Sequence, residues 1–368
     1  MYFLFNKLLN TVSLSPTIKA TLNFPFVDQN TYHKAPALRL FNLLNIRNIS
    51  TDSQITAITN SEENKYKLID PFFVSGFVDA EGCFSINIYK SKTSIGWAVK
   101  AEFTICLHSK DLPLLKEIQS FFKGIGTISI DSKRDVAYYR VNEIKSIRNT
   151  IIQHFEKYPL QSGKSVDFFL FKQCVLLMTN KEHLTLSGLK KIIAIKAVLN
   201  LGLSEQIKTS FPNVIPIIRP SYIIDKEHLN PFWVTGFSCG DSCFSLSIAE
   251  NKFQASFSIG LHNRDKDLLL KIRKFFNSNS NVISHGPNSS QLKIQGITEL
   301  KTIVIPHFLN YPLRGNKDYN FNIWKEIVEL LTNKVHLTKE GKIKLRQFKA
   351  PKGARPQGVP RRGANLNK

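Results

Sequence analysis

The feature that most constrains how this chain can fold is an internal repeat. The block Asp70-Pro-Phe-Phe-Val-Ser-Gly-Phe returns as Asn230-Pro-Phe-Trp-Val-Thr-Gly-Phe, 230 − 70 = 160 residues later. Tyr158-Pro-Leu then returns as Tyr311-Pro-Leu, and Thr179-Asn-Lys-Glu-His-Leu-Thr returns as Thr332-Asn-Lys-Val-His-Leu-Thr, both after 311 − 158 = 153 residues. Because these blocks recur in one order, the 368 residues contain two copies of one structural unit.

Each copy opens with an expected helix and continues with expected strands. Asp70 and Asn230 are suitable N-caps, and the proline that follows each of them suits the first helical turn. Apolar and polar residues alternate over 99–107 and again over 253–261, which is typical of half-buried strands. The order of elements predicts an α+β fold of two pseudo-twofold related αββαββα repeats. Helices would cover one face of each antiparallel sheet and leave the other face open.

The boundaries of the two copies follow from the repeated blocks. We place the first repeat at 65–200 and the second at 226–348, joined by a proline-containing linker at 201–225. Residues 1–60 are expected to form a poorly ordered leader or appendage, with a transit peptide and a translated upstream leader both open. Residues 349–368, rich in Gly, Pro, Lys and Arg, are expected to form a basic disordered tail.

The charge of the chain indicates the kind of partner. It carries 50 Lys and Arg against 28 Asp and Glu, a formal net charge of +22, so we expect a polyanion. No membrane partner is expected, because no run approaches the ~18 apolar residues of a membrane span. The five cysteines are scattered without a C-x-x-C pair, which argues against a disulfide framework or a zinc ribbon. They are expected to be reduced and mostly buried.

The two opening helices carry the residues best suited to chemistry. Gly76 and Gly236 would let the helix backbones approach closely, and each helix ends 81 − 76 = 5 residues later in a carboxylate, Glu81 or Asp241. Two carboxylates held together repel each other, so the arrangement makes physical sense if divalent cations lie between them. The alternative is that each acid merely ends a buried helix. The duplication of helix, strand and acid together favours the functional interpretation.

These residues also carry a resemblance. The segment Gly76-Phe-Val-Asp-Ala-Glu-Gly-Cys-Phe84 resembles a LAGLIDADG motif, and the span from about 70 to 348 resembles a single-chain, two-repeat LAGLIDADG homing endonuclease of fungal organellar introns. The repeated block His-Phe-x-x-Tyr-Pro-Leu, at His154 and His307, agrees with it. The resemblance implies saddle-shaped sheets that read a long pseudo-palindromic site in double-stranded DNA. It also implies cleavage of both strands with Mg²⁺, which would promote intron mobility.

The resemblance assigns roles to single residues. Glu81 and Asp241 would be the catalytic, metal-binding acids. Arg140 and Lys293 share one repeat position, 293 − 140 = 153, and are expected as catalytic basic groups, with ordinary phosphate contacts as the alternative. The polar strand residues are candidate DNA contacts, with a solvated strand face as the alternative; they are Ser85, Asn87, Lys100, Glu102, Thr104, Gln254 and Ser256.

The second motif departs from the first at three positions. Asp241 replaces a glutamate and draws its carboxylate back, and Cys239 stands where the first copy has Asp79. Ser242 replaces a glycine that commonly ends such a helix at positive φ, where another residue costs roughly 1–2 kcal/mol. Two functions from different classes therefore stay open.

The first function is a site-specific, metal-dependent DNA endonuclease that acts as a monomer. The alternative is a protein with weakened or lost cleavage that binds intron RNA and assists splicing, a maturase. Heavy use of Asn, Ile, Lys and Phe suggests an A+T-rich organellar gene, so we expect a mitochondrial location.

Overall fold

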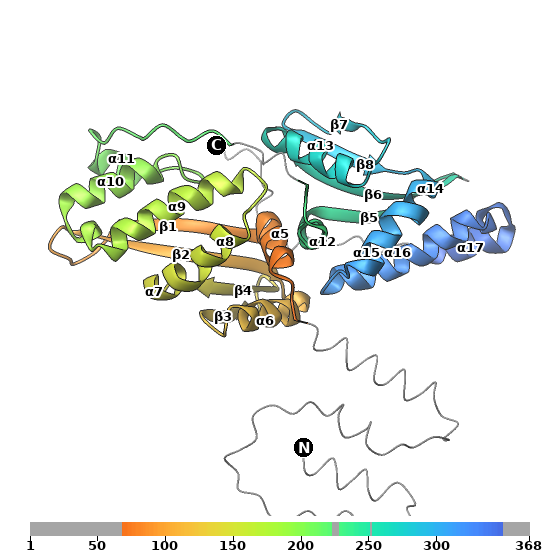
Figure 1. The fold of residues 1–368 in the computed structure, drawn as a ribbon, viewed down its shortest axis with the longest axis horizontal. Coiled ribbons are helices and arrows are strands. Elements are labelled where there is room, and N and C mark those ends of the chain that lie inside the picture. The colour runs from red at the N-terminus through yellow and green to blue at the C-terminus, as the bar shows by residue number, and fades with distance from the viewer. Residues whose placement is uncertain (1–67, 223–227, 251, 349–368) are drawn as a thin grey trace, which may run out of the picture. The chain divides into compact units, whose positions relative to one another are not determined.

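The computed structural model describes residues 68–222, 228–250 and 252–348, and it contains the two repeats (Figure 1). The first repeat consists of α5 (Pro71–Glu81), β1 (Gly82–Lys90), β2 (Trp97–His108), α6 (Leu112–Phe121), β3 (Thr127–Asp131), β4 (Val136–Val141), α7 (Ile144–Ser146), α8 (Gln153–Lys157), α9 (Lys164–Thr179) and α10 (Leu186–Lys196). The second repeat consists of α12 (Pro231–Asp241), β5 (Ser242–Ala249), β6 (Lys252–His262), α13 (Lys266–Phe275), β7 (Val282–Ser284), β8 (Ser289–Ile294), α14 (Ile297–Glu299), α15 (Ile305–Asn310), α16 (Asn316–Thr332) and α17 (Lys339–Gln347). Helix α11 (Glu205–Ser210) lies between them. The α+β prediction is confirmed, with further helices at the end of each repeat.

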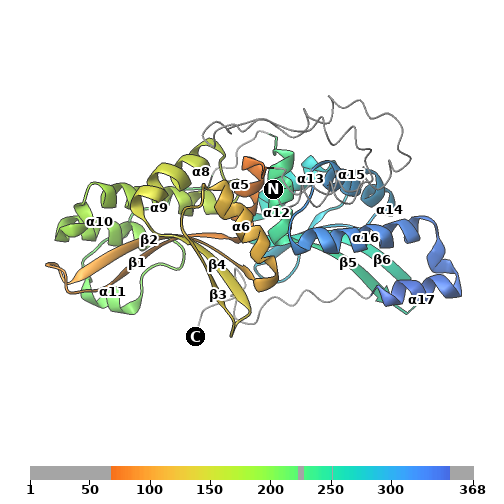
Figure 2. The same ribbon diagram turned by 90° about the horizontal axis from the view of Figure 1, so that it is seen from below.

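Each repeat contains a four-stranded antiparallel sheet. The strand orders are β1-β2-β4-β3 and β5-β6-β8-β7, so the two sheets share one topology. Phe84 lies opposite Phe103 in the first sheet, and Phe244 lies opposite Phe257 at the same register position in the second. Most helices lie on one side of the two sheets (Figure 2). The other face of each sheet carries the polar residues of the alternating pattern.

The motif helices begin as the sequence predicted. Asp70 Oδ1 accepts a 2.8 Å hydrogen bond from the backbone N–H of Phe72, and Asn230 Oδ1 accepts one of 2.9 Å from that of Phe232. These caps satisfy one of the backbone N–H groups that the first turn of a helix leaves without a partner. The start of each motif helix is therefore fixed by local sequence.

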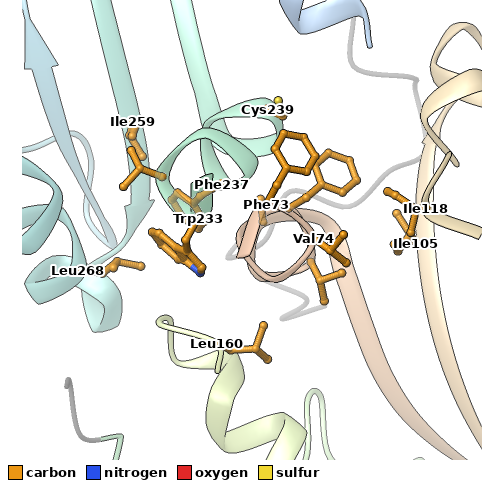
Figure 3. Close-up of a cluster of buried hydrophobic side chains, with 14 of the residues drawn as sticks. Phe73, Val74, Ile105, Ile118, Leu160, Trp233, Phe237, Cys239, Ile259 and Leu268 are labelled. Carbon is orange, nitrogen blue, oxygen red and sulfur yellow. The ribbon is translucent and has the colours of Figure 1, made fainter. Parts of the chain in front are cut away.

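One hydrophobic cluster extends through both repeats. It runs from Ile118 behind the first sheet, through Val74 of α5 and Trp233 of α12, to Leu268 behind the second sheet (Figure 3). Because the helix pair belongs to this core, the two repeats form one compact unit.

Reciprocal hydrogen bonds between the repeats flank this core. Asp111 of the first repeat accepts a 2.7 Å bond from the backbone N–H of Asn316, at the start of α16. Asp265 of the second repeat accepts a 2.7 Å bond from the backbone N–H of Gly163, just before α9. Each repeat therefore stabilises the start of a long helix in the other, since an acid near a helix N-terminus is favourable.

The first part of the predicted linker packs against the first repeat. Ile207 of α11 lies in a small hydrophobic cluster with Ile193 of α10, and the rings of Phe211 and Trp97 are 5.4 Å apart. A helix of six residues leaves too short an apolar period to be recognised in the sequence. Residues 223–227 of the linker, and the predicted appendage and tail, lie outside the described residues.

The cysteines are only partly as expected. None of the five, all of which lie within the described residues, forms a disulfide, but Cys83 and Cys243 are exposed. Each directly follows the first residue of a strand and falls on the polar side of the alternation, which the sequence pattern could have shown. No helix in the described ranges is long and apolar enough to cross a membrane.

Candidate catalytic centre between the motif helices

The two motif helices touch along their glycines. A Cβ atom on Gly76 would lie 2.0 Å from the carbonyl oxygen of Trp233, and one on Gly236 would lie 2.0 Å from that of Phe73. Any side chain at either position would collide with the backbone of the other helix. Both glycines therefore lie at the contact that brings the two helix ends together.

The two candidate acids stand at these ends. Glu81 is the last residue of α5 and Asp241 the last of α12, and both are partly exposed. A Cβ atom on Gly240, the residue before Asp241, would lie 3.0 Å from Cγ of Glu81 and 3.2 Å from its Oε1. The Glu81 side chain thus lies directly against the end of α12, so the two carboxylates belong to one centre.

Two lysines support the ends of the motif helices, and the sequence analysis did not identify them. Lys164 is buried, and its Nζ donates to the carbonyl oxygens of Val78, at 2.6 Å, and of Gly82. Lys317 donates to the carbonyl oxygen of Ser242 at 2.6 Å. The two share one repeat position, 317 − 164 = 153, which alignment of the repeats would have shown. Each lysine thus bonds to the residue that follows one of the two acids and brings a positive charge to that end of the helix.

The expectation that Ser242 strains the second helix is wrong. Its φ is −93°, and that of Gly82 is −75°, so both helices end in extended backbone that any residue adopts. Gly82 is required for a different reason, since a Cβ there would lie 2.5 Å from Cγ1 of Val78. The second repeat has Ser238 in place of Val78, and the hydroxyl of Ser242 donates to its carbonyl oxygen at 2.6 Å. The smaller neighbour makes room for the larger residue.

A charged network lies on the open face of the first sheet. Glu102 accepts hydrogen bonds from Lys100 Nζ at 2.8 Å and from Thr104 Oγ1 at 3.0 Å, and Arg140 Nε lies 4.0 Å from it. Burial acts to raise the pKa of Glu102, but these hydrogen bonds and the charges of Lys100 and Arg140 lower it below its ordinary value. Three of the predicted DNA contacts are thus already connected to one another.

The other predicted contacts differ in exposure. Asn87 and Gln254 are exposed, and the hydroxyl of Ser85 donates to the carbonyl oxygen of Glu102 at 3.3 Å. Ser256 is 3% exposed, and its Oγ lies 2.8 Å from that of Ser245. Ser256 therefore has almost no surface from which to reach a base, which argues against its prediction as a DNA contact.

The predicted basic pair occupies equivalent strand positions. Arg140 lies opposite Thr104, and Lys293 lies opposite Ser258. Arg140 donates to Ser129 Oγ at 2.8 Å and lies over the ring of Tyr138 at 3.9 Å. These contacts hold its guanidinium over the sheet, which suits a phosphate contact as well as a catalytic one.

The repeated histidines have a structural role. His154 Nε2 lies 3.1 Å from the hydroxyl of Ser75, which itself donates to the carbonyl oxygen of Tyr158 at 2.6 Å, so the histidine is the donor. The second repeat has the same bond between His307 and Thr235, also at 3.1 Å. The hydroxyls of Ser75 and Thr235 therefore face their own repeats and not the other motif helix.

The donor set fits a divalent cation that is shared with a bound phosphate. Within 68–222, 228–250 and 252–348, no group of three or more His, Cys, Asp or Glu could hold a metal ion alone. Glu81 and Asp241 offer hard carboxylate oxygens at one centre. Mg²⁺ is commonly bound by one or two carboxylates together with waters and substrate phosphates. Such a site is completed only by its substrate.

Comparison with known proteins identifies the family. A model of the LAGLIDADG endonuclease family matches residues 74–175 and 234–328, which are the two repeats. The chain belongs to this family. Probable intron-encoded endonuclease 2 of Neurospora crassa is 38% identical over 291 residues, and endonuclease 3 of the same fungus is 36% identical over 288. The alignments cover 76% of this chain but only 64% and 54% of those relatives.

Solved structures of LAGLIDADG proteins share the fold. The meganuclease I-CpaMI bound to uncleaved DNA is 39% identical with a TM-score of 0.72, over 76% of this chain and 98% of that one. I-LtrWI bound to its target DNA is 38% identical with the same TM-score, over 76% and 96%. The LAGLIDADG fold thus extends over both repeats of this chain.

Proposed function

We propose that the protein is a site-specific DNA endonuclease that hydrolyses one phosphodiester bond in each strand of a long target. The observation that carries the proposal is the position of Glu81 against the end of α12, next to Asp241, at the junction of two open, polar sheets. The DNA-bound LAGLIDADG neighbours and the intron-encoded endonucleases named above support it.

The hydrolysis needs few groups from the protein. An oxygen of water forms a bond to phosphorus, the bond from phosphorus to a sugar oxygen breaks, and the proton from water ends on the leaving oxygen. Glu81 and Asp241 would hold Mg²⁺, which when bound supplies a Lewis acid beside the phosphate. Their carboxylates would orient water through their remaining oxygens. Lys164 and Lys317, behind the acids, would offset the charge that gathers on the phosphate.

The open sheet faces would read the DNA. Asn87 and Gln254 are exposed amides suited to base edges, while Lys100 and Arg140 are suited to phosphates. The network around Glu102 holds Lys100 and Thr104 in place before DNA arrives, which reduces the entropy lost on binding. The net charge of +22 adds affinity that depends on salt and not on sequence.

The setting proposed for this activity follows from the single chain and from its relatives. One chain supplies both acids, so a monomer would be sufficient. A protein in ND4 intron 1 of Podospora anserina is 47% identical over 120 residues, which supports an intron-encoded, mitochondrial protein that promotes the mobility of its intron.

The maturase alternative has lost one of its reasons. It rested on a degraded second motif, and the backbone of Ser242 carries no strain. The shortened acid at Asp241 and the exchange of Asp79 for Cys239 remain, and they favour unequal cleavage of the two strands over a loss of cleavage.

The test is cleavage of duplex DNA that spans the intron-free insertion site, with Mg²⁺ or with EDTA. We expect metal-dependent cutting at one position, lost in Glu81→Gln and in Asp241→Asn while DNA binding is kept. Glu326→Gln, an exposed acid of α16, is the matched control and should cut normally. Normal cutting by Glu81→Gln and Asp241→Asn would refute the assignment of the centre. Splicing assisted by those variants in place of cutting would identify a maturase.

A further inference from the structure

The motif helices differ most at the position held by Asp79 in the first and Cys239 in the second. Asp79 is fully buried and accepts hydrogen bonds from the backbone N–H groups of Gln161, at 2.5 Å, and Ser162, at 3.3 Å. The hydroxyl of Ser162 also donates to it, at 2.5 Å. The carboxylate thus holds the turn that leads into α9.

A fourth donor comes from the other repeat. Trp233 Nε1 of α12 donates to Asp79 at 3.1 Å, and both residues are buried. At the pseudo-symmetric position the first repeat has Phe73, whose ring has no donor. Asp79 is therefore tied both to its own turn and to the opposite motif helix.

The turn held by Asp79 carries Lys164. Only Gly163 separates Ser162 from this lysine, whose Nζ bonds to the carbonyl oxygens of Val78 and Gly82 on either side of Glu81. Asp79 and Lys164 are both buried, and each is held by hydrogen bonds, Asp79 to the turn and Lys164 to the end of α5. The turn therefore connects the carboxylate of Asp79 to the position of the Lys164 ammonium group.

The second repeat has no carboxylate at the position of Asp79, because Cys239 stands there. Cys239 Sγ lies 3.5 Å from the backbone nitrogen of Arg314 and 3.9 Å from its carbonyl oxygen. A thiol is only a weak hydrogen-bonding group, and both of these distances are longer than those from Asp79 to Gln161 and Ser162. The turn that leads to Lys317 is therefore held by weaker contacts than the turn that leads to Lys164.

We infer that Asp79 is a positioning residue for Lys164, and that it makes the Glu81 half of the centre cut its strand before the Asp241 half cuts the other. The inference rests on the proposed DNA cleavage. It differs from an effect of acid length alone. Asp79 would act through the turn that carries Lys164, whereas the cation would be held by Glu81 and Asp241. It predicts that one buried residue sets the rate on one strand.

The experiment follows both strands of one duplex under single-turnover conditions with Mg²⁺. Lys164→Met and Lys317→Met first show which strand depends on which lysine. Asp79→Cys, the residue of the other repeat, should slow the strand that depends on Lys164 by at least about tenfold, because a small misplacement of an active-site group has a large effect on rate. The other strand should change by less than about threefold, and DNA affinity, measured with Ca²⁺ in place of Mg²⁺, should be kept.

Two further variants separate positioning from folding. Trp233→Phe, which copies Phe73 of the first repeat, removes one donor from Asp79 and should slow the same strand by a smaller factor. If Asp79→Cys does not fold, Trp233→Phe takes its place as the test. Cys239→Ser, the matched control, should leave the strand that depends on Lys164 unchanged. Equal slowing of both strands by Asp79→Cys or Trp233→Phe would overturn the inference. Failure of the unaltered protein to cut either strand would instead overturn the proposed function.

Discussion

Arg314 Nη1 of the second repeat donates a 2.6 Å hydrogen bond to the carboxylate of Glu117 in the first. At the pseudo-symmetric position, Lys271 of the second repeat donates at 2.9 Å to Oε1 of Gln161 in the first. The second repeat therefore supplies the cation on both sides of the interface, and the first supplies the acceptor. Two copies of the second repeat would place cation against cation, so the charges favour pairing of unlike repeats.

Reversing one of these charges should weaken the pairing. Glu117→Lys places a cation beside Arg314 and should lower the free energy of unfolding by about 0.5–1 kcal/mol at low salt, because the pair is partly exposed. Glu117→Gln copies the neutral acceptor of the other side and should cost less. Urea unfolding at low and high salt measures both. A cost for Glu117→Lys that does not shrink at high salt would show that the effect is not electrostatic.

The closest helix contact makes the strongest prediction about stability. Gly76→Ala should destabilise the protein by about 3 kcal/mol or more, because its Cβ would lie 2.0 Å from a backbone oxygen that cannot move aside without the whole of α12. Gly260→Ala is the matched control, since nothing lies nearer to its Cβ than a backbone oxygen of Ser290 at 4.0 Å. Thermal unfolding of both variants measures the loss of stability. A loss for Gly76→Ala no larger than that for Gly260→Ala would contradict the tight helix contact.

The exchange of Val78 and Gly82 for Ser238 and Ser242 predicts coupling between neighbouring positions. Gly82→Ser alone should destabilise by about 1–3 kcal/mol, because its Cβ would overlap with Val78. Adding Val78→Ser removes the shortest of these contacts, the one with Cγ1 of Val78, and recreates the pair found in the second repeat. The free energy of unfolding of the double variant should therefore exceed, by about 1 kcal/mol or more, the value expected if the effects of the two single changes simply added. A double-mutant cycle in urea tests this, and strict additivity would contradict it.

The parts of the structure that the sequence predicted are those set by local signals. Asp70 and Asn230 cap their helices through bonds two residues away, and the strand alternation follows from a period of two. Gly76 and Gly236 could be predicted because the repeat placed them at matching positions. In these cases the determining neighbours are close in sequence or are copied within it.

What the sequence analysis missed depends on contacts between distant segments. Lys164 lies 164 − 78 = 86 residues from the carbonyl oxygen that it meets, and its role depends on a turn held by Asp79. The strain expected at Ser242 was wrong because the turn has extended backbone, so the neighbour at Ser238 and not the φ angle decides which residue fits. No local pattern encodes either fact.

The buried histidines make stability depend on pH. Burial lowers the pKa of His154 to about 3 and that of His307 to about 4, whereas an unfolded histidine titrates near ~6.5. Between those values the unfolded chain binds more protons than the folded one, so the free energy of unfolding falls as the pH falls below about 6.5. Each pH unit well inside this window should cost up to ~1.4 kcal/mol per histidine, and about twice that for the pair.

Variants separate this effect from that of the many carboxylates. His154→Gln with His307→Gln keeps an N–H donor for Ser75 and Thr235 but cannot take up a proton, so the double variant should lose less stability than the unaltered protein between pH 6.5 and 4. Its stability at neutral pH should be lower, because each imidazole packs among aromatic rings such as Phe122 and Phe276. If urea unfolding across this range gave the double variant the same slope as the unaltered protein, the two histidines would not be neutral and buried in the native state.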